Sequence, residues 1–311
     1  MIERVQDGFK FLPMHYPFYE KKALKITSKD KSVEEYQAYI RNNNIEQAEI
    51  IMPDLKVLEG CNSLKHLRIF PSHEAPENFN FSQLYDHPEV CHLHCNNHYG
   101  DRKQYMRPLD YSKVNGLVSL SVCVNKGTLN YNRIESLKSL DVGAFQGKNR
   151  DLSDLFCSKE LDTLRLIQCK NYSLNGIDTS PKIQCLYLDY NRSLEDISAL
   201  RKVNGTIKLL RIDNCPNIQD FSVLRYLENL ELLQLCGSNV LPNLDFLKSM
   251  KNLKTFIFSM NVLDGDISPC LDLSYAYSEK NRKHYNLKDT KLPKGKYVRG
   301  NENIEEWRRL E

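Results

Sequence analysis

The densest group of chemistry-bearing residues lies in the segment PEVCHLHCNNH, residues 88–98. Its ligand-type residues are Cys91, His92, His94, Cys95 and His98. Thiolate sulfur and imidazole nitrogen are ligands that zinc takes in proteins, and a Cys–His pair also supports nucleophilic catalysis. The segment therefore raises two hypotheses, a metal centre and an enzymatic site.

The spacing of these residues argues against a simple site. Successive residues of a strand face opposite sides of a sheet, so His92 and His94 share one face and Cys95 lies on the other. The thiol of Cys95 is therefore expected to point away from the imidazoles. In the repeat described below, His66 occupies the same register as His92, about 4.8 Å away on the neighbouring strand. We expect no resident metal or cofactor, and keep a metal set of His66, His92 and His94 as an alternative to ordinary polar surface residues.

A second chemically distinctive segment is KNRKHYNLKDTKLPKGKYVR, residues 280–299. It has eight Lys or Arg against one acidic residue, so it contributes +7 to a net charge of +3 and leaves −4 elsewhere. Basic side chains interleaved with Tyr285 and Tyr297 are typical of phosphate-backbone binding. The turn at 293–295 interrupts any continuous basic helix, and the acidic remainder disfavours nucleic acid as the main partner. A solvated cap face is the favoured interpretation, and nucleic-acid attachment is kept as an alternative.

Composition and missing motifs narrow the function further. No GxxxxGK[ST], strand-linked GxGxxG or GxSxG motif is present, so we predict no catalytic residues. With 41% hydrophobic and 27% charged residues the chain is not intrinsically disordered. No apolar run approaches the roughly 18–20 residues of a membrane span, and the first residues do not form an export signal. We therefore expect a monomeric, non-enzymatic protein in the cytoplasm, with its ten cysteines reduced.

One pattern organises most of the chain. The spacing L-x-x-L-x-L recurs from residue 45 onwards, at steps of 19 to 27 residues. The copies end at Ile50, Ile69, Cys95, Val122, Val142, Leu166, Leu188, Ile212, Leu235 and Phe258. Period-two alternation predicts short strands with one buried face, and apolar residues spaced by three in the links predict short helical or 3₁₀ segments. One such unit cannot bury its apolar face alone, whereas a stack of them buries a continuous core.

This pattern resembles the leucine-rich repeat family, whose units read L-x-x-L-x-L-x-x-[N/C]-x-L. The segments LKSLDVGAFQG, KIQCLYLDYNRSLEDISALRKV and LENLELLQLCGSNVLPNLDFL carry the resemblance. A polar or small residue recurs three positions after the strand pattern: Asn125, Cys169, Asn191, Cys215 and Asn261. An inward amide there is expected to bond backbone groups of neighbouring units. The resemblance implies an α/β solenoid, with a curved parallel sheet on the concave side, short helical or 3₁₀ segments on the convex side, and caps at both ends.

The predicted organisation comprises an N-terminal cap over 1–44, leucine-rich repeats over 45–263, and a C-terminal cap over 264–311 that contains the basic segment 280–299. Ser32 and Glu35 form a capping-box pattern that predicts a helix over 33–41. Leu24 and Ile26 are consistent with a degenerate first repeat. Two longer connections, 70–89 and 96–116, are rich in aromatic residues, and either bind a partner or pack as irregular coils.

The outward strand positions define a candidate binding surface. The predicted partner-binding residues are Asp141, Arg165, Tyr187, Asp189, Tyr190, Arg211, Asp213, Leu232, Gln234, Arg68 and His94. Tyr and Arg are the residue types that dominate interface hot spots. Eleven five-residue strands spaced by about 4.8 Å project roughly 770 Å², about one side of a standard protein–protein interface. The competing interpretation is that these charges merely pair with one another on a wet surface.

These observations favour a protein-binding solenoid that recognises a protein partner of unknown identity through its concave face. The resemblance to compact bacterial repeat proteins implies an immunity-like or regulatory binder in a bacterial cytosol. A metal-binding or enzymatic site in the His/Cys cluster at 66–98 remains as an alternative, as does nucleic-acid attachment through 280–299.

Overall fold

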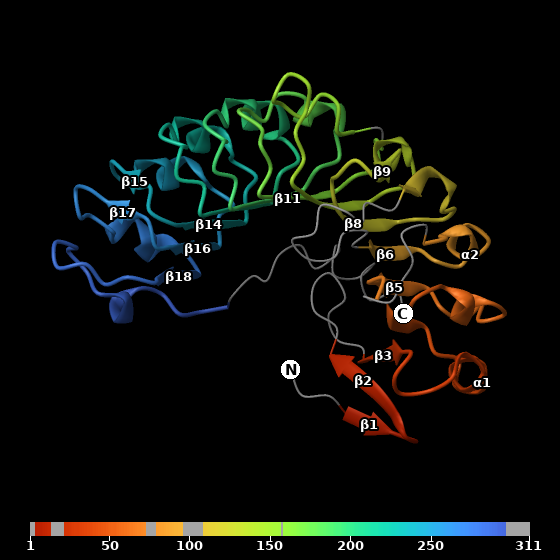
Figure 1. Cartoon of the computed structure of the whole chain (residues 1–311). Coiled ribbons are helices and arrows are strands. Elements are labelled where there is room, and N and C mark those ends of the chain that lie inside the picture. The colour runs from red at the N-terminus through yellow and green to blue at the C-terminus, as the bar shows by residue number, and fades with distance from the viewer. Residues whose placement is uncertain (1–3, 14–21, 73–78, 96–107, 157, 297–311) are drawn as a thin grey trace. The chain divides into compact units, whose positions relative to one another are not determined.

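The computed structural model describes residues 4–13, 22–72, 79–95, 108–156 and 158–296. The chain forms two compact units, unit 1 over residues 1–140 and unit 2 over residues 141–311. Each unit is built on strands connected by short helical segments (Figure 1). Among the described residues, no helix combines the length and apolar character needed to cross a membrane.

Both α-helices among the described residues lie in unit 1. Its elements are β1 (Arg4–Gln6), β2 (Phe9–Pro13), β3 (Lys22–Thr27), α1 (Val33–Asn43), β4 (Gln47–Ile51), η1 (Lys56–Leu58), β5 (His66–Ile69), α2 (Ser82–Tyr85), β6 (His92–Cys95), β7 (Leu109–Asp110), η2 (Tyr111–Lys113), β8 (Ser119–Cys123), β9 (Thr128–Leu129) and η3 (Tyr131–Arg133), where η marks a 3₁₀ helix. The next strand, β10 (Ser139–Gly143), contains the boundary between the units.

The sheet of unit 1 has the order β1-β2-β3-β4-β5-β6-β8, antiparallel at β1–β2 and β2–β3 and parallel from β3 onwards. Leu24 and Ile26 of β3 pair with Ala48 and Ile50, the register of a first repeat. The α1 helix begins with the predicted capping box. The Ser32 Oγ accepts a hydrogen bond from the backbone N–H of Glu35 at 3.2 Å, and the Glu35 carboxylate accepts one from the N–H of Ser32 at 2.9 Å.

Unit 2 contains the most regular repeats. Its elements are β11 (Thr163–Ile167), η4 (Ile177–Thr179), β12 (Cys185–Asp189), η5 (Ser198–Val203), β13 (Leu209–Asp213), η6 (Ser222–Tyr226), β14 (Leu232–Cys236), β15 (Val240–Leu241), η7 (Asp245–Ser249), β16 (Thr255–Phe258), β17 (Asn261–Val262), η8 (Ser268–Asp272), β18 (Tyr275–Ser278) and η9 (Asp289–Lys291). The strands β11, β12, β13, β14, β16 and β18 lie on one side of unit 2, and the segments η4 to η8 lie on the other (Figure 1). The short strands β15 and β17 pair with each other in a separate two-stranded sheet.

The strands of the unit 2 sheet follow the order β11-β12-β13-β14-β16-β18 and are parallel and in register. The inward positions of β11 to β16 are at most 1% exposed: Leu164, Leu166, Leu186, Leu188, Leu210, Ile212, Leu233, Leu235, Phe256 and Phe258. Full burial of such a side chain contributes about 1.5–3 kcal/mol, so this repeated pair of apolar residues supplies a continuous core. The predicted parallel, stacked repeat is confirmed.

Two local features recur in several repeats of unit 2. After β11, β12 and β13 the chain passes through a left-handed residue, with φ of 52° at Gln168, 58° at Tyr190 and 53° at Asn214. The N–H of each of these residues bonds to the carbonyl that ends the next strand, at 2.8–3.0 Å. The 3₁₀ segments η5 to η8 each begin with an Asx turn, as where Asp220 Oδ1 accepts the N–H of Ser222 at 2.7 Å. These devices keep successive turns in the same geometry.

Buried amides connect neighbouring repeats, as predicted. Asn191 is 2% exposed, its Oδ1 accepts the N–H of Cys169 at 2.7 Å, and its Nδ2 donates to the carbonyl of Leu166 at 2.9 Å. In the repeat that ends with β14 this role falls to Asn239, whose Nδ2 donates to the carbonyls of Cys215 and Ile218 at 2.9 and 2.7 Å. The turn that contains this extra position passes through Gly237, whose φ of 130° is one that glycine adopts readily.

The last parallel strand, β18, lies beyond the predicted end of the repeats at 263. It pairs with β16, with Thr255 opposite Tyr275 and Phe256 opposite Ala276. The pattern here is Leu273-x-x-Ala276-x-Ser278, in which small residues replace the second and third apolar positions. Sequence reasoning missed this strand because Ala and Ser carry little hydrophobic signal.

Candidate functional site

A network of ion pairs connects three adjacent strands of unit 2. Asp189 at the end of β12 contacts Arg165 of β11, with the Nε 2.5 Å from Oδ2, and Arg211 of β13, with the Nε 3.1 Å from Oδ1. The Nη2 of Arg211 also donates to Oδ2 of Asp213 at 3.0 Å. The parallel register sets these contacts, because Asp189 pairs with Ile167 on one side and Asp213 on the other. We call Arg165, Asp189, Arg211 and Asp213 the ion-pair network.

The network is graded in exposure. The Asp189 side chain is fully buried, whereas those of Arg165 and Arg211 retain 22% and 31% exposure. The contact between Arg211 Nε and Asp189 Oδ1 is an ion pair without hydrogen-bond geometry, since neither atom has a hydrogen-bond partner within the described residues. Two Arg and two Asp balance in charge. The four charged residues therefore pair with one another, and these ion pairs hold both guanidinium groups in place.

Aromatic and apolar residues flank this network. Tyr187 of β12 is half-buried and packs against a buried cluster of Cys185, Leu209 and Leu232. Tyr190, which follows β12, is 48% exposed. The predicted site residue Leu232 is therefore core-like, whereas Tyr190 is open to solvent.

The remaining predicted binding residues of unit 2 differ in their exposure to solvent. Asp141 is only 3% exposed. Gln234 of β14 is half-buried, and its Nε2 lies 3.5 Å from Sγ of Cys236. Their assignment to a binding surface stays a prediction.

In unit 1 the predicted residues Arg68 and His94 lie on the adjacent strands β5 and β6. Arg68 forms an ion pair with Glu49 at 3.0 Å, and its guanidinium lies 5.3 Å from the ring centre of Phe70. The Nδ1 of His94 lies 2.8 Å from Oγ of Ser121. Burial and the neighbouring Arg68 charge lower the pKa of His94 to about 4. His94 is therefore a neutral, positioned imidazole at pH 7.

The two histidines of the alternative metal set lie together. The rings of His66 and His92 stack with centroids 4.3 Å apart and planes 9° apart, and each residue is 5% exposed. His94 does not join them, because it lies in the next outward register position, beside Arg68. The structure thus brings together two of the three residues of this alternative set.

The two longer connections place their described aromatic residues inside unit 1. Phe79 and Phe81 are 4% and 3% exposed, and Tyr111 is fully buried. The hydroxyl of Tyr85 accepts the N–H of Asp110 at 3.1 Å, which ties the two connections together. Residues 73–78 and 96–107 lie outside the described residues. The described parts support packing rather than a free aromatic surface.

The described part of the basic segment, residues 280–296, contacts the end of the repeats. Lys294 donates to the carbonyl of Ala276 at 2.8 Å and pairs with Asp289 at 2.8 Å. Arg282 donates to the carbonyl of Ser259 at 3.2 Å, and His284 Nε2 lies 2.9 Å from the carbonyl of Val262. Part of the positive charge therefore bonds backbone groups of the last strands, which favours the cap interpretation over nucleic-acid binding.

Tyr285 tests this cap directly. Its hydroxyl accepts the N–H of Val262 at 3.1 Å and donates to the carbonyl of Met260 at 3.2 Å, and the residue is 9% exposed. We expect Tyr285→Phe to lower the free energy of unfolding by about 2 kcal/mol, because two buried backbone groups lose their partner. Urea denaturation measures this change, with Tyr277→Phe, at a 39% exposed position, as the control. Equal midpoints for both variants would contradict the cap assignment.

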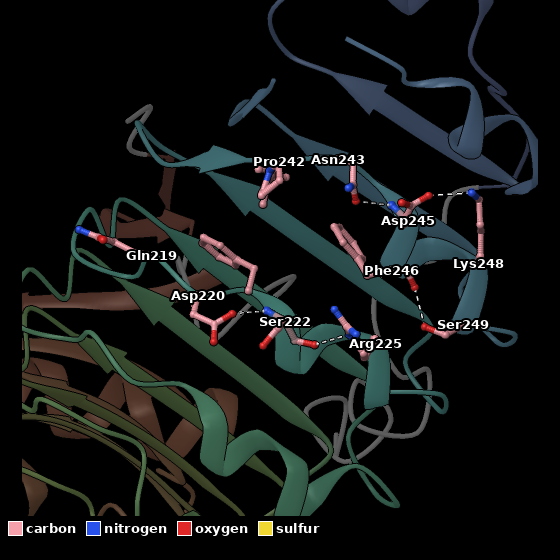
Figure 2. A pocket seen from close by; sticks show the side chains of 12 residues that line it. Gln219, Asp220, Ser222, Arg225, Pro242, Asn243, Asp245, Phe246, Lys248 and Ser249 are labelled. Carbon is pink, nitrogen blue, oxygen red and sulfur yellow. Dashed lines mark hydrogen bonds and ion pairs between the residues drawn. The ribbon is translucent and has the colours of Figure 1, made fainter. Parts of the chain in front are cut away.

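A groove lies on the helical side of unit 2, between η6 and η7, with a volume of about 680 Å³ (Figure 2). Its polar groups are engaged locally. Lys248 pairs with Asp245 at 2.7 Å, and Arg225 Nε donates to the carbonyl of Ser222 at 3.2 Å. The Ser222 N–H lowers the pKa of Asp220, which keeps this carboxylate ionised. The groove is therefore a space between two 3₁₀ segments rather than a converging set of reactive groups.

No protein-family model matches the chain, and no curated protein matches it. Among solved structures, an internalin of Listeria monocytogenes is 12% identical to this chain with a TM-score of 0.41. The match covers 79% of this chain and 64% of the internalin. A leucine-rich repeat protein of Leptospira interrogans is 12% identical with a TM-score of 0.39, and the match covers 81% of this chain and 82% of that protein. A chain in the structure of the Drosophila Toll–Spatzle complex is 14% identical with a TM-score of 0.31, and the match covers 83% of this chain and 34% of that one.

The fold assignment rests on the strands, the core and the bonds between turns of this molecule. Parallel strands stack in register, their L-x-L residues form the core, and Asn or Cys residues join successive turns through backbone bonds. Solenoids built this way generally present an extended binding surface. The chain has the fold of the leucine-rich repeat proteins.

Proposed function

We propose that this chain is a non-enzymatic solenoid that binds a protein partner through the outward face of the unit 2 sheet. The ion-pair network beside Tyr187 and Tyr190 carries the proposal. Asp189 is buried between two Arg side chains that keep part of their surface in solvent. Because ion pairs already hold these long side chains, a partner would order them at a smaller entropic cost. Tyr and Arg are also the residue types that contribute most to interface hot spots.

The dimensions of this face define the kind of contact. Six strands spaced by about 4.8 Å, each about 16 Å long, project roughly 380 Å². This is about half of one side of a standard interface. A partner would therefore also contact the turns that follow the strands, where Tyr190 is 48% exposed.

The electrostatics of the cysteines support a non-enzymatic role. Burial raises the pKa of Cys215 to about 11, and those of Cys95 and Cys270 to about 12. An activated thiol nucleophile needs a lowered pKa instead. These thiols are therefore protonated and unreactive at neutral pH, as expected of residues chosen for packing.

The finer proposal concerns biological context. A binder acting as a monomer in a bacterial cytosol, in an immunity-like or regulatory role, fits the sequence resemblance to compact bacterial repeat proteins. The partner is a protein whose contacting surface accommodates tyrosine rings and partly exposed guanidinium groups.

A matched pair of variants tests the binding face. Tyr187→Ala combined with Tyr190→Asn removes both rings, and Asn tolerates the positive φ of residue 190. Tyr226→Ala removes a 37% exposed ring from η6, on the other side of unit 2. Affinity capture from the native cell lysate with the wild-type chain identifies the partner, and titration of the purified partner measures each variant.

We expect the double variant to bind at least about 30-fold more weakly, the equivalent of a 2 kcal/mol hot spot. The Tyr226 variant should bind as wild type. Circular dichroism and urea denaturation establish that both variants are folded. A partner that binds the folded double variant with wild-type affinity would place its site elsewhere on the chain.

A further inference from the structure

The three ligand-type side chains that lie closest together are in unit 1, on the adjacent strands β5 and β6. His66, Cys91 and His92 place one ligand atom each so that all three lie within 4.8 Å of one another. They form the one such cluster of three or more among the described residues. The cluster differs from the alternative metal set considered in the sequence analysis, because Cys91 takes the third position in place of His94.

The fold explains how these residues meet. His66 and His92 pair in the parallel register, which places their rings in a stack with centroids 4.3 Å apart. Cys91 immediately precedes β6, outside the regular alternation that was used to place Cys95. Its Sγ lies 3.7 Å from the carbonyl of Lys65, the residue that precedes His66 on the neighbouring strand. The thiol therefore reaches toward the strand that carries the other imidazole.

We propose that His66, Cys91 and His92 form a binding site for a zinc ion. Two imidazole nitrogens and one thiolate are a ligand set that zinc accepts, with water in the fourth position. Zn–N distances of about 2.0–2.1 Å and a Zn–S distance of about 2.3 Å place tetrahedral ligands roughly 3.3–3.7 Å apart. The three ligand atoms lie within 4.8 Å of one another, so a bound zinc ion would draw them about 1 Å closer together.

The surroundings supply a second, independent observation. Gln47 of β4 pairs with His66 in register and is 8% exposed. Its Oε1 is buried without a hydrogen-bond partner among the described residues. An orphaned acceptor beside a metal ligand is placed to receive a hydrogen bond from a metal-bound water or from a ligating imidazole. Metal binding would therefore supply a donor that the described residues do not provide.

The competing interpretation is a packing role. Two stacked, buried imidazoles fill the space between the strands without any ion, and the Sγ of Cys91 already has a weak acceptor in Lys65. The two interpretations differ in one measurable respect. Only a metal site requires the thiolate and both imidazoles to bind the same ion.

Cobalt(II) is the probe, since it occupies zinc sites and its thiolate bond gives a near-ultraviolet charge-transfer band. The full chain, treated with chelator and kept reduced with a phosphine, is titrated with Co²⁺ and then with Zn²⁺. We expect one equivalent of Co²⁺ to produce this band together with tetrahedral d–d bands, and Zn²⁺ to abolish them. Cys91→Ser should remove the charge-transfer band, and His66→Asn or His92→Asn should weaken Co²⁺ binding at least tenfold.

Control variants isolate the site. Cys123→Ser removes a half-buried thiol of β8, and His94→Gln removes the neighbouring imidazole, so both should keep the wild-type spectrum. Alkylation of the wild-type chain gives a second measurement, in which Zn²⁺ should slow modification of Cys91 and leave that of Cys123 unchanged. No charge-transfer band in the folded wild type, or a band that survives Cys91→Ser, would overturn the proposal.

Discussion

Replacing Asp189 by Ala is expected to lower the free energy of unfolding by about 3–5 kcal/mol, the range measured when one partner of a buried ion pair is removed. Asp189 is 0% exposed and serves Arg165 at 2.5 Å and Arg211 at 3.1 Å. Its loss leaves two guanidinium groups close together without their shared counter-ion. Because both Arg side chains are partly exposed, solvent recovers part of this cost, which places the expected value near the lower end of the range.

Urea denaturation of the wild type and of Asp189→Ala measures the effect, with the m-value showing whether the transition is still two-state. Asp213→Ala is the matched control on the neighbouring strand. Its side chain keeps 14% exposure and pairs only with Arg211 among the described ion pairs, so the expected loss is about 1 kcal/mol. A loss for Asp189→Ala no greater than that for Asp213→Ala would mean that burial does not set the strength of the network.

The same pair of variants connects stability to binding. If the ion-pair network holds Arg165 and Arg211 for a partner, folded Asp189→Ala should bind more weakly although Asp189 itself is inaccessible. Asp213→Ala should affect binding less, because Arg211 keeps its contact with Asp189.

Replacing Asn191 by Ala is expected to lower the free energy of unfolding by about 2–4 kcal/mol. The amide satisfies the N–H of Cys169 at 2.7 Å and the carbonyl of Leu166 at 2.9 Å, both in the preceding repeat. Each buried backbone group left without a partner costs about 1–3 kcal/mol. Both losses fall at one junction, so the stacking of β11 on β12 should weaken there.

The control for this prediction is an exposed amide with a similar bond. Asn217 donates to the carbonyl of Arg192 at 2.8 Å on the surface, where water replaces a lost partner. Asn217→Ala should therefore cost only about 0.5 kcal/mol. Hydrogen exchange at Cys169 gives an independent readout, since its amide should lose protection in Asn191→Ala alone. Unchanged protection would show that the amide bond is not what joins the repeats.

The repeat was predictable because it depends on a periodic requirement. Each strand must bury alternate residues, and the backbone groups of each buried turn need a hydrogen-bond partner. The spacing therefore predicts that Leu186 and Leu188 are buried and that Asn191 bonds the backbone. Where small residues satisfy the same requirement, as Ala276 does in β18, the hydrophobic signal vanishes although the strand remains. Three positions after the strand pattern of β14 stands Ser238, but the buried amide comes from Asn239, one residue later. The spacing did not show this either, since the turn there is one residue longer and passes through Gly237 at positive φ.

The candidate sites followed less completely from sequence. Register alone placed Arg165, Tyr187 and Arg211 on one face of neighbouring strands. It did not show that Asp189 is buried between two of them, because burial depends on the packing of side chains from three strands. Nor did alternation along β6 show that Cys91 approaches His66 and His92, because Cys91 lies just before the strand, where the alternation rule ends.

By itself, therefore, the sequence determined the fold class, the stacked strands and the buried amides, since these depend on residue spacing along one chain. Only the tertiary structure decided which charges are buried, which aromatic residues remain exposed, and which ligand atoms meet. Those properties depend on distances between side chains of different repeats. The periodicity of the sequence predicts which residues lie on neighbouring strands, but it does not predict how close their side-chain atoms come.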